Sequence, residues 1–225
     1  MNEAMDLKYV GTRPVRPDGT EKVTGKADYG ADISRPGMVH GVVLRSPHAH
    51  AQINGIDASE ALALEGVYAV VTVDDFPQRD TISINRRRYF EQIIAGGKVL
   101  YHGHPVAAVA AKSADLAQRA AELIRVDYTV LPAVLDVQAA MADDAPILHD
   151  DLYTDGVNPP PKGPSNISQV TRISKGDVQA GFAEADIVVE RRFVTPMVHQ
   201  GYIEPHACMA DAHADGRVSL WCSSQ

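Results

Sequence analysis

The sequence predicts an α+β protein. Short β-rich runs alternate with an amphipathic helical segment between residues 38 and 130. Within that region, residues 106–111 form an apolar run of strand length without any polar side chain. Near the end of the sequence, residues 207–222 have the pattern of a β-hairpin. Helices and mainly hairpin-connected strands in these places favour α+β packing around a buried core.

The first predicted unit has the order strand, strand, helix, strand. Its elements are expected at 38–45, 51–56, 59–64 and 67–72. Ser59 is the expected N-terminal cap of the helix, because a serine hydroxyl can accept hydrogen bonds from the first free amides. Gly66 should end this helix, since glycine tolerates a positive φ.

The second predicted unit is a strand, a helix and a strand, at 106–111, 113–124 and 125–130. The unbroken apolar run of the first strand suits burial on both faces. Ser113 is the expected cap of the helix. Apolar side chains then recur at helical spacing at Leu116, Ala120, Leu123 and Ile124.

Two segments lack a regular pattern. Residues 78–97 are predicted to form an exposed loop that contains Arg86, Arg87 and Arg88. Such a run could receive a phosphate or an acidic partner, but a solvated face is the commoner role. Residues 151–166 are rich in proline and glycine, which predicts an extended linker and a domain boundary.

Beyond this linker the pattern predicts a helix from Asp177 to Glu184, a strand at 187–194, and hairpin arms at 207–212 and 217–222. Asp215 and Gly216 between the arms are a strong turn signal. Alternation in the last arm places Val218, Leu220 and Cys222 on one side, the predicted core side. A final strand left uncovered is a pairing hazard, so we expect further protein to complete this sheet.

Composition excludes several classes of function. The 225 residues are 45% apolar, which predicts a globular protein with a substantial core. The 21 basic and 29 acidic side chains give a net charge of −8, which argues against a nucleic-acid partner. The first residues lack the pattern of a signal peptide, and no apolar run approaches the roughly 20 residues that span a bilayer. We therefore expect a cytoplasmic protein without a membrane partner.

The two cysteines, Cys208 and Cys222, lie on the two arms of the predicted hairpin. A disulfide between them is conceivable if the register allows it. Two buried, reduced thiols are the favoured interpretation, because cytosolic proteins rarely keep disulfides and the sequence has no CxxC spacing.

Two His-x-His pairs stand out, His48 with His50 and His102 with His104. In a strand this spacing puts both rings on one face, as a metal site requires. Both pairs fall in predicted turns without a third ligand nearby, so metal binding is the less favoured interpretation. The sequence also lacks the GxxxxGK, GxGxxG and GxSxG motifs, and its residues do not form a catalytic constellation by themselves.

Several motifs, in this order, resemble one known family. Residues 23–32 (VTGKADYGAD) and 41–51 (GVVLRSPHAHA) are similar to the α/β hammerhead domain that opens the large subunit of molybdenum hydroxylases of the xanthine dehydrogenase and aldehyde oxidase family. Residues 101–110 (YHGHPVAAVA) continue the likeness. Residues 190–193 (ERRF) and 199–206 (HQGYIEPH) resemble the start of that family's molybdopterin-binding domain.

The resemblance implies an α/β hammerhead domain followed by the first portion of a mixed α+β molybdopterin-binding domain. The expected limits are an N-terminal extension at 1–19, the hammerhead domain at 20–150, the proline-rich linker at 151–166 and the incomplete molybdopterin-binding domain at 167–225.

The resemblance also implies a role for the last residues. Ser223, Ser224 and Gln225 fit the family's Ser-x-Gln, whose glutamine amide hydrogen-bonds an oxygen ligand of molybdenum. An amide suits this role because its NH2 group donates while remaining uncharged; an ordinary polar strand end is the alternative. Glu204 and His199 are implied to support the fold or the surroundings of the cofactor rather than to act as the base, and the same holds for His206.

The family's GGGFGGK segment, its later catalytic glutamate and its iron-sulfur and flavin modules are absent from this sequence. The resemblance therefore implies part of an oxidoreductase that hydroxylates an aldehyde or N-heteroaromatic carbon with oxygen from water, inactive as this chain alone. It implies a molybdenum-molybdopterin cofactor, a chain or segment that completes the domain, iron-sulfur and FAD subunits, and a small-molecule substrate. The alternative is a non-catalytic scaffold or assembly module from a split or truncated gene.

Overall fold

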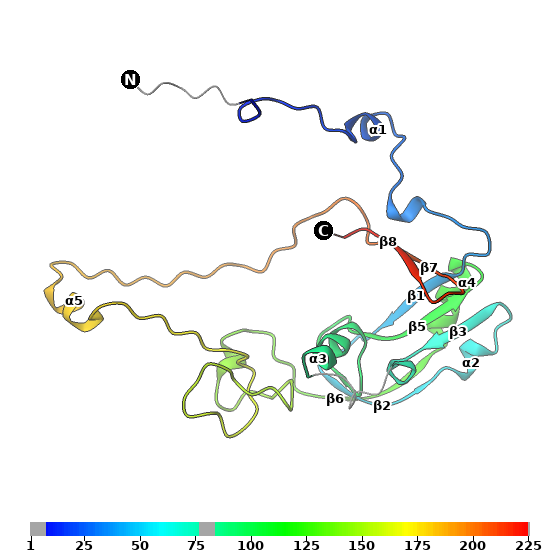
Figure 1. The fold of residues 1–225 in the computed structure, drawn as a ribbon. Coiled ribbons are helices and arrows are strands. Elements are labelled where there is room, and N and C mark those ends of the chain that lie inside the picture. Colours follow the sequence, from blue (N-terminus) through cyan, green and yellow to red (C-terminus); the bar gives the residue numbers. More distant parts are fainter. Residues whose placement is uncertain (1–7, 77–83, 225) are drawn as a thin grey trace. The chain divides into compact units, whose positions relative to one another are not determined.

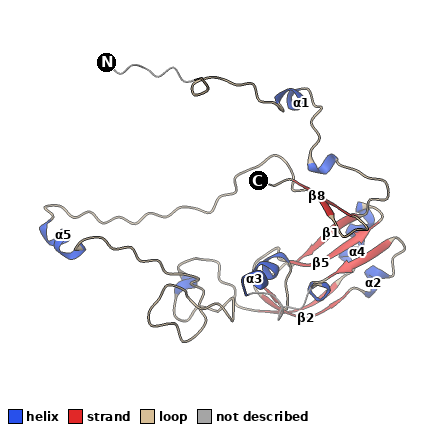
Figure 2. Ribbon diagram, viewed as in Figure 1, coloured by secondary structure: helices blue, strands red, loops and turns tan. Residues whose placement is uncertain are grey.

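The computed structural model describes residues 8–76 and 84–224 (Figure 1). The chain divides into two compact units. The larger unit is formed by Gly37–Val189, and the smaller unit combines Met1–Pro36 with Glu190–Gln225. Helices and strands occur in both (Figure 2), as the α+β prediction requires.

The larger unit contains two antiparallel three-stranded sheets. In the first, β5 (Pro105–Ala111) lies between β1 (His40–Arg45) and β3 (Val67–Val71). In the second, β2 (Ala51–Asp57) lies between β4 (Lys98–Val99) and β6 (Arg125–Val130). The predicted strands of both units of the sequence are thus confirmed within a residue or two of their expected bounds.

The core of the larger unit lies between β5 and α4 (Ala114–Glu122). Small side chains let the helix approach the sheet closely, and Ala107, Val109 and Ala111 contribute from the strand. Val106, which precedes Ala107 and points to the other face, belongs to a second buried cluster. The predicted burial on both faces is confirmed in part: Val106 is buried on the second face, and Ala108 and Ala110 on the same face are half-buried. The cap is confirmed as well, because the Ser113 hydroxyl accepts a hydrogen bond from Leu116 N at 3.3 Å.

The short helix α2 (Ser59–Leu62) corrects one prediction. Ser59 is its first residue rather than its cap, and the Asp57 carboxylate accepts the hydrogen bond from the Ser59 amide at 2.9 Å. An Asp two residues before a free amide can make this bond as well as a serine can. Gly66 does follow the helix with a φ of +91°, and an added Cβ would lie only 2.9 Å from the side chain of Lys112.

The predicted exposed loop at 78–97 is wrong over most of its described part. Residues Ile84–Ile93 form helix α3. This segment contains no glycine or proline, and its arginines, glutamine and glutamate are good helix formers, which offset the absence of an apolar stripe. Arg86, Arg87 and Arg88 lie within α3, and their side chains fall outside the described part of the structure.

Residues 151–166 contain no helix or strand, but hydrogen bonds tie this segment to its surroundings. The Asn166 side chain donates to Ala140 O at 3.1 Å and to Pro146 O at 3.0 Å, and it accepts from Leu148 N. The segment lies inside the larger unit. Further along the same unit, α5 (Val178–Glu184) begins as predicted, with Asp177 accepting from Ala180 N at 3.0 Å.

The smaller unit contains α1 (Gly19–Val23), the 3₁₀ turn η1 (Gly30–Asp32) and the hairpin of β7 (Cys208–Ala212) and β8 (Val218–Cys222). The hairpin and its turn are confirmed, and Gly216 has the positive φ of +85° that the turn needs. The strand predicted at 187–194 has no pairing partner within residues 8–76 and 84–224, and this segment has no regular structure there.

The orientation predicted for the hairpin is also wrong. Val218 and Leu220 are 63% and 59% exposed, whereas Met209 on the opposite face is buried at 9%. The alternation itself is as predicted, but Met209 is on the buried face, and Trp221 on the same face contacts Arg35 of the N-terminal segment, a placement that no local pattern indicates. Cys208 and Cys222 lie opposite each other in the register, and both are free and exposed rather than buried.

Candidate functional site

His199 and His206, two of the residues singled out in the sequence, form an aromatic cluster with Tyr202 in the smaller unit. The Tyr202 ring lies between those of His199, at a centroid distance of 4.8 Å, and His206, at 4.5 Å. The backbone amide of Gly201 donates to His199 Nδ1 at 3.0 Å, which orients that imidazole. The structure thus brings His199 and His206 together around one tyrosine.

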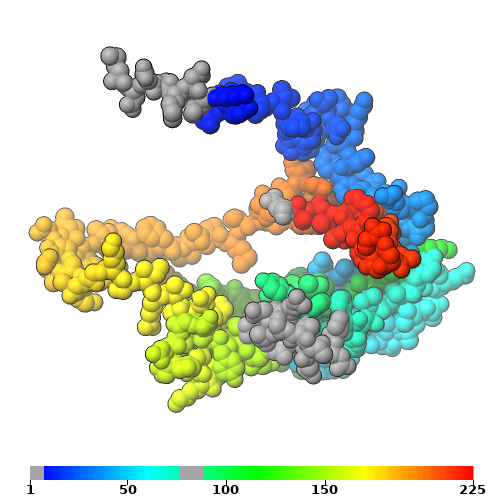
Figure 3. All heavy atoms as spheres, viewed as in Figure 1, coloured from blue at the N-terminus to red at the C-terminus, as the bar shows by residue number. Residues whose placement is uncertain are grey.

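Glu204 is separate from this cluster. It is exposed, and it makes no hydrogen bond or ion pair with another described residue. In the space-filling view residues 190–206 run as a stretch one chain thick (Figure 3), and every residue in that range is exposed. Nothing in the described part of the chain therefore holds the Glu204 carboxylate in a catalytic position.

The residues that follow β8 are tied to the start of β7. Ser223 N donates to Ala207 O at 3.0 Å, and Ala207 N donates to the Ser223 hydroxyl at 2.8 Å. The same hydroxyl lies 3.2 Å from Pro205 O and 3.3 Å from Ala207 O. Ser223 therefore connects the end of the 199–206 loop to the strand that precedes Gln225. Gln225 itself lies outside the described residues.

An N-terminal segment of the same unit packs against this junction. An added Cβ on Gly30 would lie 3.5 Å from Ala207 O and 3.6 Å from Ser223 N, so the Gly30 backbone adjoins both residues. The Arg35 guanidinium lies 5.2 Å from the centre of the Trp221 ring, within the range of a cation–π contact. Sequence reasoning missed this neighbourhood; the only signal was a glycine within the VTGKADYGAD motif, which had served the family resemblance alone.

The two His-x-His pairs do not form metal sites in the structure. His102 is exposed whereas His104 is fully buried and accepts from Leu100 N, at 3.2 Å, through Nδ1. His50 bonds Pro132 O at 2.7 Å, while the His48 ring contacts Tyr128 edge-on. Among the described residues no group of three or more His, Cys, Asp or Glu side chains could hold a metal ion.

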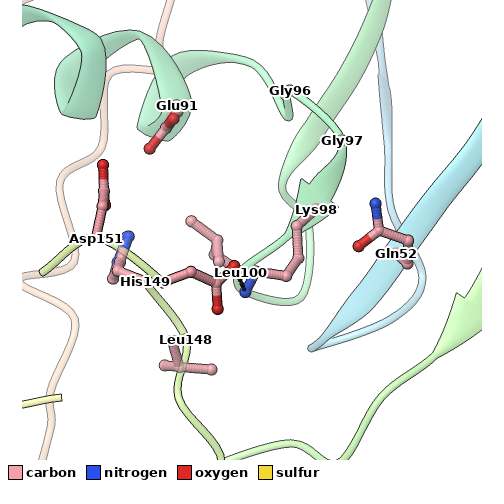
Figure 4. Close-up of a pocket in the computed structure, with 10 residues that line it drawn as sticks. Gln52, Glu91, Gly96, Gly97, Lys98, Leu100, Leu148, His149 and Asp151 are labelled. Carbon is pink, nitrogen blue, oxygen red and sulfur yellow. Dashed lines mark hydrogen bonds and ion pairs between the residues drawn. The ribbon is translucent and has the colours of Figure 1, made fainter. Parts of the chain in front are cut away.

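A separate cavity of about 360 Å³ lies in the larger unit (Figure 4). Lys98 and Gln52 line it from β4 and β2, and Lys98 forms an ion pair with Asp150 at 2.9 Å. Charges of both signs line the cavity, and no residue predicted for the site belongs to it.

No helix in the described part of the chain is long and apolar enough to cross a membrane.

Comparison with known proteins gives two consecutive domain matches. Residues 24–132 match the family model described as "Aldehyde oxidase and xanthine dehydrogenase, a/b hammerhead domain". Residues 160–225 match the "Molybdopterin cofactor-binding domain". The folded sheets of the larger unit thus fall in the first match, and the loop and hairpin of the candidate site fall in the second.

Individual relatives carry both domains. The chain is 33% identical over 98% of its length to the nicotinate dehydrogenase large molybdopterin subunit of Eubacterium barkeri, of which it spans 48%. It is 34% identical over 99% of its length to the carbon monoxide dehydrogenase large chain of Afipia carboxidovorans, of which it spans 28%. The solved aldehyde oxidoreductase from Desulfovibrio gigas matches with a TM-score of 0.74 and 30% identity, over 93% of this chain and 23% of that one.

The two matched domains follow each other in this chain, and the matched Eubacterium barkeri relative is named a large molybdopterin subunit. The chain belongs to the xanthine dehydrogenase and aldehyde oxidase family. It spans less than half the length of each of these relatives.

Proposed function

We propose that this chain serves as one part of a molybdenum hydroxylase that oxidises an aldehyde or an N-heteroaromatic carbon. In this reaction the substrate carbon gains an oxygen from water, and two electrons and two protons leave. For an aldehyde the product is a carboxylic acid. The chain by itself does not carry the reaction, because the described residues of the candidate site contain no positioned base.

The observation that carries this proposal is the uncovered apolar surface in the part of the chain that matches the molybdopterin-binding domain. Val218 and Leu220 are 63% and 59% exposed on one face of the hairpin. Upstream, Phe193 is 89% and Ile203 98% exposed. Folded domains usually bury most of their large apolar side chains, since burying them is favourable. This surface fits a domain completed by further protein, in the same polypeptide or in another.

The residues present fit the implied cofactor as neutral hydrogen-bonding groups rather than as ligands of the metal. No cluster of described residues could ligate a metal, so the family's cofactor would bring its own ligands to molybdenum. The last residue of the sequence offers a neutral polar group, the Gln225 amide. When bound, the molybdenum cofactor accepts the two electrons of the oxidation. We assign Gln225 the role of donating a hydrogen bond toward it through the side-chain NH2, which adds no charge.

His199 and His206 support this site through the shape of the 199–206 loop rather than as acid or base. Their rings are held against Tyr202. The loop ends at Pro205 and Ala207, which the Ser223 hydroxyl contacts. Glu204 is assigned to the same supporting role, in contact with the segments that complete the domain.

We further propose that partner chains carry iron-sulfur clusters and FAD, which accept the electrons in turn. The name of the Eubacterium barkeri relative, a large molybdopterin subunit, supports an enzyme built of several subunits. The limits 20–150 and 167–225 for the two domains, and a cytoplasmic location, are part of the same proposal. The relatives carry enzyme names, which disfavours the non-catalytic scaffold.

The test is to purify the complete enzyme through this chain and to measure its intact mass, its molybdenum content and its turnover, with Gln225→Ala beside the wild type. We expect molybdenum in both proteins and a fall in kcat of about 10–100-fold in the variant, the range for losing a group that orients a metal site. Material without molybdenum would refute the proposal, and unchanged kcat in Gln225→Ala would refute the role of that residue.

A further inference from the structure

The hydrogen bonds at the end of the hairpin follow an unusual pattern. His213 N donates to Arg217 O at 2.8 Å, so this opposed pair is hydrogen-bonded. The register runs from there through Met209 opposite Trp221. Two residues further on, Ala207 stands opposite Ser223, and alternation makes this a hydrogen-bonded pair as well.

Only one of the two backbone bonds of that pair is made in the ordinary way. Ser223 N donates to Ala207 O at 3.0 Å. The reciprocal donor, Ala207 N, bonds to the Ser223 hydroxyl at 2.8 Å instead of to the Ser223 carbonyl. A side-chain oxygen thus replaces the main-chain acceptor. The chain can therefore leave the strand direction after Ser223 without leaving the Ala207 amide unpaired, which would be costly.

The 3₁₀ turn η1 braces this junction from the N-terminal side. Its shape is fixed by two local bonds, from Asp32 N to Tyr29 O at 2.9 Å and from Tyr29 N to the Asp32 carboxylate at 3.0 Å. Gly30 at the start of the turn lies close to Ala207 and Ser223, because an added Cβ would already be in van der Waals contact with Ala207 O, Ala207 Cβ and Ser223 N. A larger side chain there would have to fit beside these atoms, two of which belong to the backbone.

We propose that Ser223 and the Tyr29–Asp32 turn form a clamp at the exit of the chain from β8, and that this clamp supports the role assigned to Gln225 two residues further along the sequence. Ser223 sets the point and direction at which the chain leaves β8, and Gly30 allows the turn to hold that point from outside. Ser223 and Gly30 are thus positioning residues that act through Gln225. This inference rests on the proposed function, because it concerns the residue assigned to face the cofactor.

The experiment compares variants of the complete enzyme loaded with molybdenum. Ser223→Ala removes the acceptor of the Ala207 amide, and Ser223→Thr retains it. Ser224→Ala is the matched control, since the neighbouring Ser224 hydroxyl only approaches Cys222 Sγ, at 3.5 Å. Gly30→Leu tests the brace. The readouts are hydrogen exchange of the Ala207 amide, the electron paramagnetic resonance signal of molybdenum(V), and kcat separated from KM.

We expect Ser223→Ala to speed exchange at Ala207, to change the molybdenum(V) signal and to lower kcat about 3–10-fold with little change in KM, below the effect of losing Gln225 itself. Ser223→Thr should restore all three readouts, and Ser224→Ala should leave them within about twofold of the wild type. Gly30→Leu should resemble Ser223→Ala, and the double variant should cost less than the product of the two single effects, because both act on one junction.

Two other results would distinguish a failure of the clamp from a failure of the role proposed for Gln225. If Gln225→Ala changes the signal while Ser223→Ala matches Ser224→Ala, the clamp is refuted and the proposed function stands. If Gln225→Ala leaves the signal and kcat unchanged, the role of Gln225 fails and the clamp fails with it. Should Gly30→Leu not fold, the Ser223→Ala and Ser223→Thr pair still decides the question.

Discussion

The two compact units of this chain differ in how completely their apolar side chains are buried. In the larger unit, one face of β5 is fully buried, and its Ala107, Val109 and Ala111 are at most 2% exposed. In the smaller unit Met209 is the only buried apolar residue among those the structure describes, and Val218 and Leu220 on the other face are open. Strands thus contribute to a buried core in the larger unit, whereas the hairpin of the smaller unit has one covered face and one exposed face.

The difference shows that hydrophobic periodicity identifies the faces of a strand but not what covers them. The helix α4 that covers the first sheet follows β5 directly in the sequence. For the hairpin, one face is covered by a segment from the far end of the chain, around Gly30 and Arg35. The other face has no cover within the described residues. We infer that the larger unit carries most of the stability of this chain.

The most direct test of this difference in burial is to place a charged side chain in a strand of each unit. Val109→Asp puts a carboxylate without a partner into the centre of β5, which should cost more than about 4 kcal/mol and unfold the larger unit. Far-ultraviolet circular dichroism during urea denaturation measures the loss of α4 and its sheet.

Val218→Asp is the matched control in the same chain, because Val218 is 63% exposed. We expect a change within about 0.5 kcal/mol in the same denaturation curve. Trp221 is the only tryptophan and lies in the smaller unit, so its fluorescence follows that unit separately. A large loss of stability in Val218→Asp, or a small one in Val109→Asp, would contradict the difference between the two regions.

The next effect, about 1 kcal/mol, concerns the helix that completes the core. Ser113→Ala removes the hydroxyl that accepts from Leu116 N, and losing such a cap usually costs about that much free energy of unfolding. Ser59→Ala is the control, because Ser59 caps no helix and its change should stay within a few tenths of a kcal/mol. Equal effects of the two substitutions in urea denaturation would show that α4 does not limit the stability of the larger unit.

These two serines also show how far the fold could be predicted from the sequence. Both precede a helical pattern, and both were expected to be caps. Ser113 follows a strand and starts a helix with a clear apolar stripe, so local chemistry and tertiary packing agree. At α2, the Asp57 carboxylate accepts the hydrogen bond from the first free amide, that of Ser59 itself, so Ser59 does not serve as the cap. The helix α3 was missed because its residues favour a helix by intrinsic propensity, without the apolar periodicity on which the prediction relied.

The candidate site was predictable to a smaller extent. The hairpin and its Asp215-Gly216 turn follow from local turn chemistry. The bond from Ala207 to the Ser223 hydroxyl does not, because it depends on the register of the whole hairpin. The approach of Gly30 to that junction joins residues from the two ends of the chain. No periodicity or spacing in a single sequence indicates such a long-range contact.

The smallest effect we predict is a pH dependence of the free energy of unfolding of the larger unit. The His104 side chain is buried, stacks on Tyr101 at a centroid distance of 4.3 Å, and accepts from Leu100 N through Nδ1. Burial lowers the pKa of His104, and the nearby backbone of Glu91 offsets this only in part.

Because its folded-state pKa is lowered, His104 binds fewer protons in the folded than in the unfolded chain as the pH falls below about 6.5. The free energy of unfolding should therefore decrease in that window, down to the lowered pKa. His104→Asn keeps an acceptor near Leu100 N but cannot titrate, so urea denaturation at several pH values should give a flatter slope, whatever its stability at neutral pH. His102→Asn, on the exposed side of the same turn, should keep the wild-type slope. A slope that persists in His104→Asn would mean that another group, and not this buried imidazole, makes the larger unit sensitive to acid.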